Sequence, residues 1–298
     1  MLSASLSYSQ GRKKSSIQKS KTEGMKKYEG YFNFFYDEKQ DKIYLLIDKL
    51  DEEFLYVSSL TAGIGSNDIG LDRGQLGGKK VVKFVRTGPK VLLVQPNYDY
   101  RAVSDNQDER RAVEQAFAQS VIWGFIVDEE KANGVLVDAT DFFMRDAHNV
   151  SGRLKRSKQG SYRPDFTRSA LYPDQIKAFP ENVEFEATLT FTGEPQGGYI
   201  RSVTPSPEAV TVRQHHSFIK LPDNNYKPRK FDPRAGYFAM SYMDYATPID
   251  KPVRKRFITR HRLEKKDPVA AINEPVEPII YYLDRGAPEP VRTALLEG

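Results

Sequence analysis

The sequence predicts an α+β protein built mainly from antiparallel β-sheets, with one long packing helix. Many short runs of β-branched and aromatic residues alternate with polar residues, which is typical of half-buried strands. Glycine and proline, 20 and 18 of the 298 residues, separate these runs as turns. Strands and helices do not alternate regularly along the chain, so a doubly wound parallel sheet is not expected.

The first half of the chain is predicted to form strands joined by short turns. These strands are Tyr28–Phe35, Lys42–Ile47, Phe54–Leu60, Lys80–Arg86, Lys90–Gln95, Phe125–Val127 and Val135–Asp138. Polar or Gly-Pro turns join the first and second, and the fourth and fifth, as hairpins. The glycine-rich loop Thr61–Gly78 lacks the Gly-Lys-Ser/Thr ending of a phosphate-binding loop, so we interpret it as structural.

The stretch Asp105–Trp123 is predicted to be the long helix. Asp105 is a plausible N-cap, and Asp108 and Glu109 would stand in the first helical turn. Apolar residues recur at helical spacing from Val113 onward. Such a stripe predicts a helix whose apolar face packs against the sheet.

A second, short helix is predicted over Phe142–Ala147. Asp138 and Asp141 flank Thr140 just before it, which could indicate a carboxylate site. A simpler interpretation is that Thr140 or Asp141 caps this helix. The basic stretch that follows, Arg153–Arg163, is predicted to be a solvated loop.

The second half of the chain continues with strands. Alternation predicts a strand over Val183–Phe191, with Val210–Leu221 as its antiparallel partner. A basic strand is expected over Arg256–Glu264, and a further apolar strand over Pro278–Asp284. The helix Pro288–Leu296 comes after it.

Composition and charge exclude several classes of function. The formal net charge is only +5, from 45 Lys and Arg against 40 Asp and Glu, and no nucleic-acid-binding motif is present, so no nucleic-acid partner is expected. No apolar run approaches the roughly 18 residues of a membrane-spanning helix. Cysteine is absent, which excludes disulfides, thiol nucleophiles and cysteine-ligated zinc.

The four histidines give no metal-binding pattern. A zinc site of the HExxH type needs two histidines one helical turn apart, and the sequence holds no such pair. His215 and His216 are adjacent, so on a strand they point to opposite faces. His148 is expected in a loop, and His261 lies among arginines. No Gly-x-Ser-x-Gly elbow occurs either. The sequence therefore assigns no catalytic, cofactor-binding or metal-ligating residue.

The first residues allow two interpretations. Met1–Gly24 is polar and basic, as in a disordered leader. Small residues such as Ala4, Ser7 and Ser9 also resemble the cleavage region of a secretory signal, although a charged n-region and a full apolar h-region are missing.

An ordered set of short blocks resembles a known family. The blocks are Asp138–Phe143, Phe179–Glu184, Leu221–Pro222, Pro228–Arg229, Asp232–Phe238, Arg260–Lys265 and Pro278–Asp284. Over about Lys26–Gly298 the chain is similar to the N-terminal region of large exported zinc-dependent metallopeptidases of bacteria. Those proteins carry a metzincin-like catalytic domain, with an HExxHxxGxxH motif, after a long region of unassigned function.

The resemblance implies a division of the chain into three parts. Residues 1–25 would be the leader or signal remnant, 26–270 a β-rich accessory region, and 271–298 the first strand and helix of a metzincin-like catalytic domain truncated before its zinc motif. Zinc would bind only in the full-length protein, and this chain alone is expected to be inactive. The implied partners are the missing catalytic domain and a peptide or protein substrate, and the implied location is outside the cytoplasm.

A second interpretation is a stand-alone cell-envelope module that binds peptide or glycan through aromatic strands. The sequence does not indicate the substrate or the oligomeric state.

Overall fold

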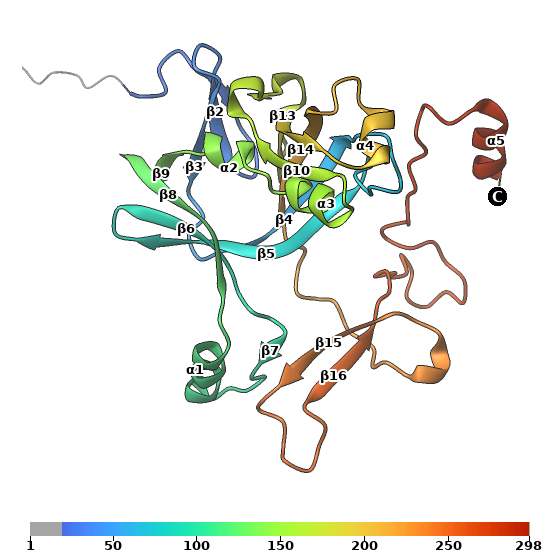
Figure 1. The fold of residues 1–298 in the computed structure, drawn as a ribbon. Helices are drawn as coiled ribbons and strands as arrows, with labels where there is room; N and C mark the ends of the chain where they lie inside the picture. Colours follow the sequence, from blue (N-terminus) through green and yellow to red (C-terminus); the bar gives the residue numbers. More distant parts are fainter. Residues whose placement is uncertain (1–19, 298) are drawn as a thin grey trace, which may run out of the picture. The chain divides into compact units, whose positions relative to one another are not determined.

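The computed structural model describes residues 20–297, which form two compact units (Figure 1). Within these residues, unit 1 comprises 20–96 and 119–222, and unit 2 comprises 97–118 and 223–297. The chain thus leaves unit 1 once, returns to complete it, and leaves it again. These boundaries separate compact units of the structure, whereas the division at residues 26 and 271 comes from the family resemblance. That division stays a prediction. Most of the predicted leader lies outside the described residues.

Unit 1 is an antiparallel sheet whose strands are largely the predicted ones (Figure 1). Along its main path the order is β1 (Lys26–Tyr28), β2 (Asn33–Asp37), β3 (Lys42–Ile47), β9 (Gly134–Asp138), β8 (Ser120–Lys131), β6 (Lys90–Gln95), β5 (Leu76–Thr87), β4 (Glu53–Ala62), β14 (Ala209–Lys220), β13 (Asn182–Pro195) and β10 (Gly160–Pro164). The short strands β11 (Ala170–Leu171) and β12 (Lys177–Ala178) also pair with β13. The hairpins β2–β3 and β5–β6 and the pairing of β13 with β14 confirm the predictions.

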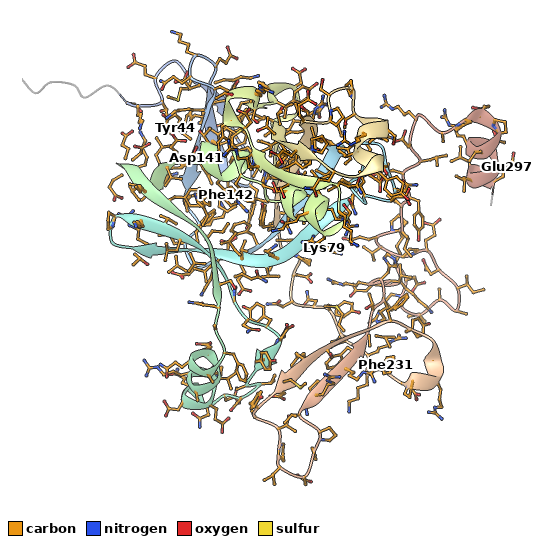
Figure 2. All side chains as sticks on the ribbon, viewed as in Figure 1. Tyr44, Lys79, Asp141, Phe142, Phe231 and Glu297 are labelled. Atoms are coloured by element: carbon orange, nitrogen blue, oxygen red, sulfur yellow. The ribbon has the colours of Figure 1, made fainter. Side chains whose placement is uncertain are left out.

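The sheet curls into a nearly closed, barrel-like form. Phe34 on β2 and Phe185 on β13, which are far apart in the strand order, have ring centroids only 4.7 Å apart. The amide of Tyr31 also donates to the carbonyl of Phe179 over 2.8 Å. The enclosed core is rich in aromatic residues with no exposed surface: Phe32, Phe34, Phe54, Phe84, Phe142, Phe143, Phe185, Phe191 and Phe218. Phe142 is labelled among the side chains of this unit in Figure 2.

The helix predicted over Asp105–Trp123 is confirmed only in its first part, with Asp108 and Glu109 in the first turn, and the prediction that it is long and packs against the sheet was wrong. Helix α1 (Gln107–Ala116) belongs to unit 2, has no buried residue, and is capped by Asn106, whose side chain accepts from the amide of Asp108. From Ser120 the chain is strand β8. There the β-branched and aromatic residues pair with β6, and this long-range pairing outweighs their local helical spacing.

The prediction of a solvated loop over Arg153–Arg163 was also wrong. Helix α3 (Val150–Arg156) and strand β10 occupy this stretch. Val150 and Leu154, four residues apart and therefore on one helix face, are both buried in the core. Two apolar residues therefore anchor the helix. Basic residues surround them in the sequence, so their helical spacing is not evident there.

Two more short helices and two 3₁₀ turns complete unit 1. These are α2 (Thr140–Met144), α4 (Gly198–Val203), η1 (Phe166–Arg168) and η2 (Pro173–Gln175). Helix α2 begins earlier than predicted, and its first amide is capped by neither Thr140 nor Asp141. The carboxylate of Asp138 instead accepts from both the amide and the hydroxyl of Thr140, over 3.0 and 2.6 Å.

Unit 2 contains a small sheet in the order β16 (Arg254–Ile258), β15 (Ala239–Asp244) and β7 (Tyr100–Arg101), in which β7 is parallel to β15. The ring of Tyr100 stacks on that of Phe117 with centroids 3.9 Å apart. The unit also holds η3 (Pro233–Ala235) and α5 (Glu289–Glu297).

The C-terminal part of unit 2 differs from the prediction in one respect. The segment 278–284, predicted as a strand, has no regular secondary structure, whereas α5 lies where a helix was expected. Within residues 20–297, no helix is both long enough and apolar enough to cross a membrane.

Candidate functional site

The adjacent histidines of β14 point to opposite faces of the sheet, as the sequence predicts. His216 is completely buried in the interior, and His215 lies on the other face among acidic residues. His148 precedes α3, and His261 lies in unit 2. Across the described part of the chain, no group of three or more His, Cys, Asp or Glu residues is arranged to hold a metal ion.

On the outer face, His215 is held between two carboxylates. Its Nε2 lies 2.7 Å from Glu184 and its Nδ1 2.9 Å from Glu186, a residue with only 1% of its surface exposed. Burial alone would lower the pKa of His215, but the hydrogen bonds and charges of Glu184 and Glu186 outweigh it and raise this pKa to about 9. The imidazole is therefore a cation at neutral pH. It joins β13 to β14 as an ion pair and is unsuited to act as a general base there.

On the inner face, His216 belongs to a buried network with Tyr56, Arg145 and Gln214. Its Nδ1 lies 2.9 Å from the hydroxyl oxygen of Tyr56, and its Nε2 lies 3.0 Å from the carbonyl oxygen of Phe143. Nη2 of Arg145 donates to the same Tyr56 oxygen over 2.9 Å. The side-chain nitrogen of Gln214 donates to the carbonyl of Arg145 and lies 2.9 Å from Nε2 of His216, and its side-chain oxygen accepts from the backbone N–H of His148.

The ring of His216 and the phenol of Tyr56 are neutral. Burial and the charge of Arg145 lower the pKa of His216 to about 3, and burial raises the pKa of Tyr56 to about 12. Burial likewise lowers the pKa of His148. The guanidinium of Arg145 therefore lies beside a neutral imidazole and a neutral phenol.

Arg145 is enclosed mainly by aromatic rings. Its guanidinium carbon lies 4.4 Å from the ring centroid of Phe142, 5.7 Å from that of Tyr56 and 5.9 Å from that of Trp123. Its Nε is buried without a hydrogen-bond partner. A cation in such surroundings is expensive to bury unless a counter-ion or strong hydrogen bonds compensate it.

A second cation, Lys80, lies on the same interior side of the sheet. It is directly opposite Tyr56 in the β4–β5 register and alternates with the buried Val82 and Phe84. Burial, followed by the positive charge of Arg145, lowers the pKa of Lys80. Lys80 and Arg145, which we call the basic pair, are both half-buried and thus within reach of solvent. The basic pair is the candidate functional site.

Sequence reasoning missed the basic pair, although part of it left a signal. In the expected strand Lys80–Arg86, a lysine occupies a position on the apolar face, where a solvated charge is out of place. Arg145 gave no comparable signal, because the sequence predicted it inside a short helix. In the structure α2 ends at Met144, and this end of the helix sets the position of Arg145.

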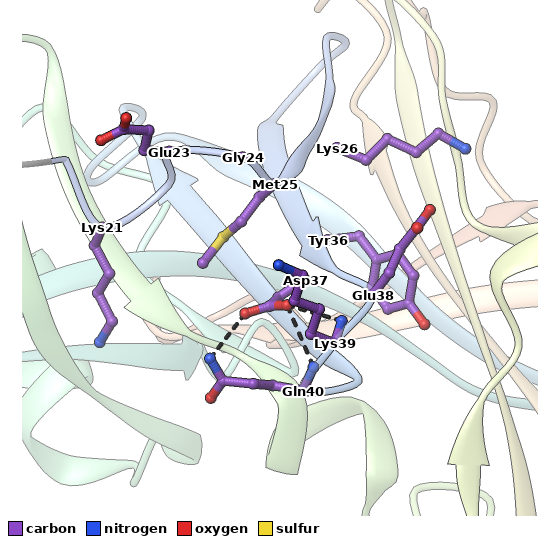
Figure 3. Close-up of a pocket in the computed structure, with 10 residues that line it drawn as sticks. All are labelled: Lys21, Glu23, Gly24, Met25, Lys26, Tyr36, Asp37, Glu38, Lys39 and Gln40. Atoms are coloured by element: carbon purple, nitrogen blue, oxygen red, sulfur yellow. Dashed lines mark hydrogen bonds between the residues drawn. The ribbon is translucent and has the colours of Figure 1, made fainter.

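A hollow between β1 and the β2–β3 turn holds no comparable convergence of groups (Figure 3). Its volume is about 500 Å³, and charges of both signs line it. Asp37 accepts from the amides of Lys39 and Gln40 and from the side chain of Gln40, as in an ordinary polar turn.

Comparison with protein families gives two matches. Residues 14–63 match the family described as Domain of unknown function (DUF5118), and residues 74–266 match the family described as Domain of unknown function (DUF5117). The second match covers more than half of the chain. The chain belongs to the DUF5117 family. Both members of the basic pair lie within the DUF5117 region, while Tyr56 lies within the DUF5118 region. No curated protein and no solved structure matches the chain.

Proposed function

We propose that this chain is a non-catalytic portion of an exported zinc-dependent metallopeptidase, and that it supports or shapes the catalytic domain. The proposal includes the metzincin-like assignment of the C-terminal segment, in which residues 278–283 form the first strand of the catalytic sheet. Peptide bond cleavage would then depend on zinc ligands supplied by the catalytic domain.

The apolar segment before α5 is the observation that carries the proposal. Ile279, Ile280, Tyr281 and Tyr282 are 42, 62, 87 and 91% exposed, and the segment pairs with no strand. A contiguous run of large apolar side chains in water is unfavourable and is typical of a surface that another structure covers. Pairing with a sheet of a catalytic domain would bury these side chains and satisfy the backbone of the segment.

The order of blocks along the chain supports the same proposal. Short blocks from Asp138–Phe143 to Pro278–Asp284 follow one another as in the exported metallopeptidases that the sequence resembles. Helix α5 then follows the apolar segment at the place where those proteins have the first helix of the catalytic domain.

The test begins with the gene. We expect the reading frame after codon 298 to encode an HExxHxxGxxH motif, and an immediate stop codon would contradict the proposal. The 298-residue chain and the extended chain would then be compared by hydrogen–deuterium exchange and by chelator-sensitive proteolysis. We expect residues 278–284 to exchange rapidly in the shorter chain and slowly in the extended one, and only the extended chain to cleave peptides.

The alternative of a stand-alone module that binds peptide or glycan rests on the aromatic strands. In unit 1 those side chains, among them Phe34, Tyr36 and Tyr44, are buried. The aromatic content of these strands is thus accounted for by packing and does not favour the alternative.

A further inference from the structure

We infer that the basic pair, Lys80 and Arg145, binds a carboxylate group attached to an apolar body. Both cations lie on the interior face at the end of the sheet where β5 begins, and both are half-buried. The ligand would place its carboxylate between the ammonium and the guanidinium and its apolar part against the half-buried ring of Trp123.

The basic pair carries charge that no carboxylate contacts within the described residues. Within residues 20–297, neither Lys80 nor Arg145 forms an ion pair with a carboxylate. Asp146 is the acidic residue whose charge acts on Arg145, but its two oxygens accept from the amides of Val150 and Ser151 at the start of α3, over 2.7 and 3.0 Å. Two like charges that raise each other's cost of burial form a site that an anion stabilises.

The hydrogen-bond donors of Arg145 are only partly used. Arg145 uses Nη2 for the hydroxyl of Tyr56, while its Nε is buried with no partner. Since Nε is closed to solvent, the donor that an incoming carboxylate can reach is Nη1, which forms no hydrogen bond within residues 20–297, and a guanidinium-to-carboxylate hydrogen bond is a strong one. Nδ1 of His148 is a further buried atom without a partner near the start of β5.

Aromatic rings lie beside the guanidinium of Arg145, where the apolar part of the ligand would pack. Trp123 and Phe142 both lie within 6 Å of the guanidinium carbon, as ring-centroid distances of 5.9 and 4.4 Å show. Trp123 is half-buried, so part of its ring remains available to a ligand. The accessible part of Trp123 favours an apolar group next to the carboxylate over a small inorganic anion, whereas Phe142 is fully buried and only lines the guanidinium from within.

Trp123 makes the site directly observable, because it is the only tryptophan of the chain. Tryptophan fluorescence of the full 298-residue protein would be titrated with cyclohexanecarboxylate, which does not absorb in the tryptophan range. Cyclohexanecarboxamide is the neutral control of the same shape. We expect a saturable change with the carboxylate and none with the carboxamide at equal ionic strength.

A matched pair of lysine variants distinguishes binding at the basic pair from a general effect of the net charge of the protein. Lys80→Gln should weaken carboxylate binding at least about tenfold, since it removes a charge-assisted hydrogen bond. Lys79→Gln removes the same charge from the neighbouring exposed position, labelled in Figure 2, and should leave binding unchanged. Arg145→Gln should abolish the response, and its circular dichroism and melting curve would be recorded because Arg145 also supports Tyr56.

Three outcomes would overturn the inference. The first is an equal response to the carboxamide, and the second is an equal loss of affinity in Lys79→Gln and Lys80→Gln. The third is a response to inorganic phosphate without one to cyclohexanecarboxylate, which would refute the assignment of a carboxylate. Quenching of Trp123 by iodide relative to neutral acrylamide gives an independent readout. We expect Lys80→Gln, but not Lys79→Gln, to reduce the iodide quenching constant.

Discussion

The hydroxyl of Tyr56 is shared between a cation and a neutral imidazole, with Nδ1 of His216 at 2.9 Å and Nη2 of Arg145 also at 2.9 Å. Because the guanidinium can only donate, the phenol oxygen accepts from it and directs its own hydrogen to His216. We therefore assign the ring proton of His216 to Nε2, which donates to the carbonyl of Phe143, while the amide nitrogen of Gln214, 2.9 Å from the same Nε2, directs a hydrogen to the carbonyl of Arg145. The hydroxyl thus connects α2 to the neighbouring strands β4 and β14.

The first prediction is that Tyr56→Phe destabilises unit 1. The change leaves Nδ1 of His216 without a donor and removes the acceptor of Nη2 of the Arg145 guanidinium. Losing a partner of buried polar groups costs about 1–3 kcal/mol. Urea unfolding should show this loss, whereas Tyr199→Phe, at a tyrosine with 49% of its surface exposed, should change stability by less than about 0.5 kcal/mol.

The second prediction is that the two adjacent histidines give opposite pH dependences of stability. The pKa of His215 is raised to about 9, so its contribution is complete below its unfolded pKa near 6.5 and is lost as the pH rises through about 9. The pKa of His216 is lowered to about 3, so its contribution is complete above pH 6.5 and is lost as the pH falls toward 3. Stability from this pair should therefore be greatest near pH 6.5.

Two measurements check this prediction. Titration of the histidine ring signals by nuclear magnetic resonance should give His215 an apparent pKa near 9. Because the pKa of His216 is about 3, the same titration should show its ring neutral above about pH 5. Between about pH 6.5 and 9, the free energy of unfolding should fall further in the native chain than in His215→Gln. The difference between the two falls should be at most ~3 kcal/mol. Equal slopes in the two proteins would show that Glu184 and Glu186 do not hold a charged imidazole.

The strands were predictable because their signal is local. In β13, alternation from Val183 to Phe191 fixes both the strand and its buried face, and the same period places His215 and His216 on opposite faces. The start of β8 was not predictable from a local pattern. Its apolar residues fit helical spacing, and pairs such as Leu93 with Trp123 decide the outcome only when β6 is in place.

The candidate site was only partly predictable, since it depends on groups that meet in space. Tyr56, His216 and Arg145 come from β4, β14 and the end of α2, and no spacing in the sequence relates them. The position of Lys80 on an apolar strand face is the one local sign. Conversely, the basic stretch at α3 resembled a solvated loop because its two buried residues are outnumbered by charges.

The third prediction distinguishes the role of Asp138, which precedes α2, from that of Asp141, which lies in its first turn. The carboxylate of Asp138 holds the first turn through Thr140 and also pairs with Lys42 at 2.8 Å. Burial would raise the pKa of Asp138, but these hydrogen bonds outweigh it and lower the pKa. Asp138→Ala should therefore cost about 1–2 kcal/mol, as loss of a cap does. The loss should diminish as the pH falls through the carboxyl range, since the native stabilisation needs the ionised form.

The matched control for this change is Asp141→Ala, at the exposed acidic residue labelled in Figure 2. Its side chain stands in the first turn of α2 and should contribute only a small interaction with the helix dipole. Thermal melts of both variants give the comparison. A larger loss in Asp141→Ala than in Asp138→Ala would restore the capping assignment made from the sequence.

The fourth prediction concerns two adjacent glycines at the start of β5. A methyl group at Gly77 would lie 2.6 Å from Oγ of Ser58, 2.8 Å from Nδ1 of His148 and 2.9 Å from the carbonyl oxygen of Ser58. Since the last of these is backbone, the strands must separate to admit it, and Gly77→Ala should cost about 1–3 kcal/mol. At Gly78 a methyl group would meet only the flexible end of Lys80, so Gly78→Ala should leave the free energy of unfolding nearly unchanged. Urea unfolding of the two variants measures the difference.

Because Gly78→Ala displaces the ammonium of Lys80 without disturbing the strand, it should also weaken carboxylate binding to the basic pair. A stable Gly78→Ala variant with native affinity would place that ammonium outside the site.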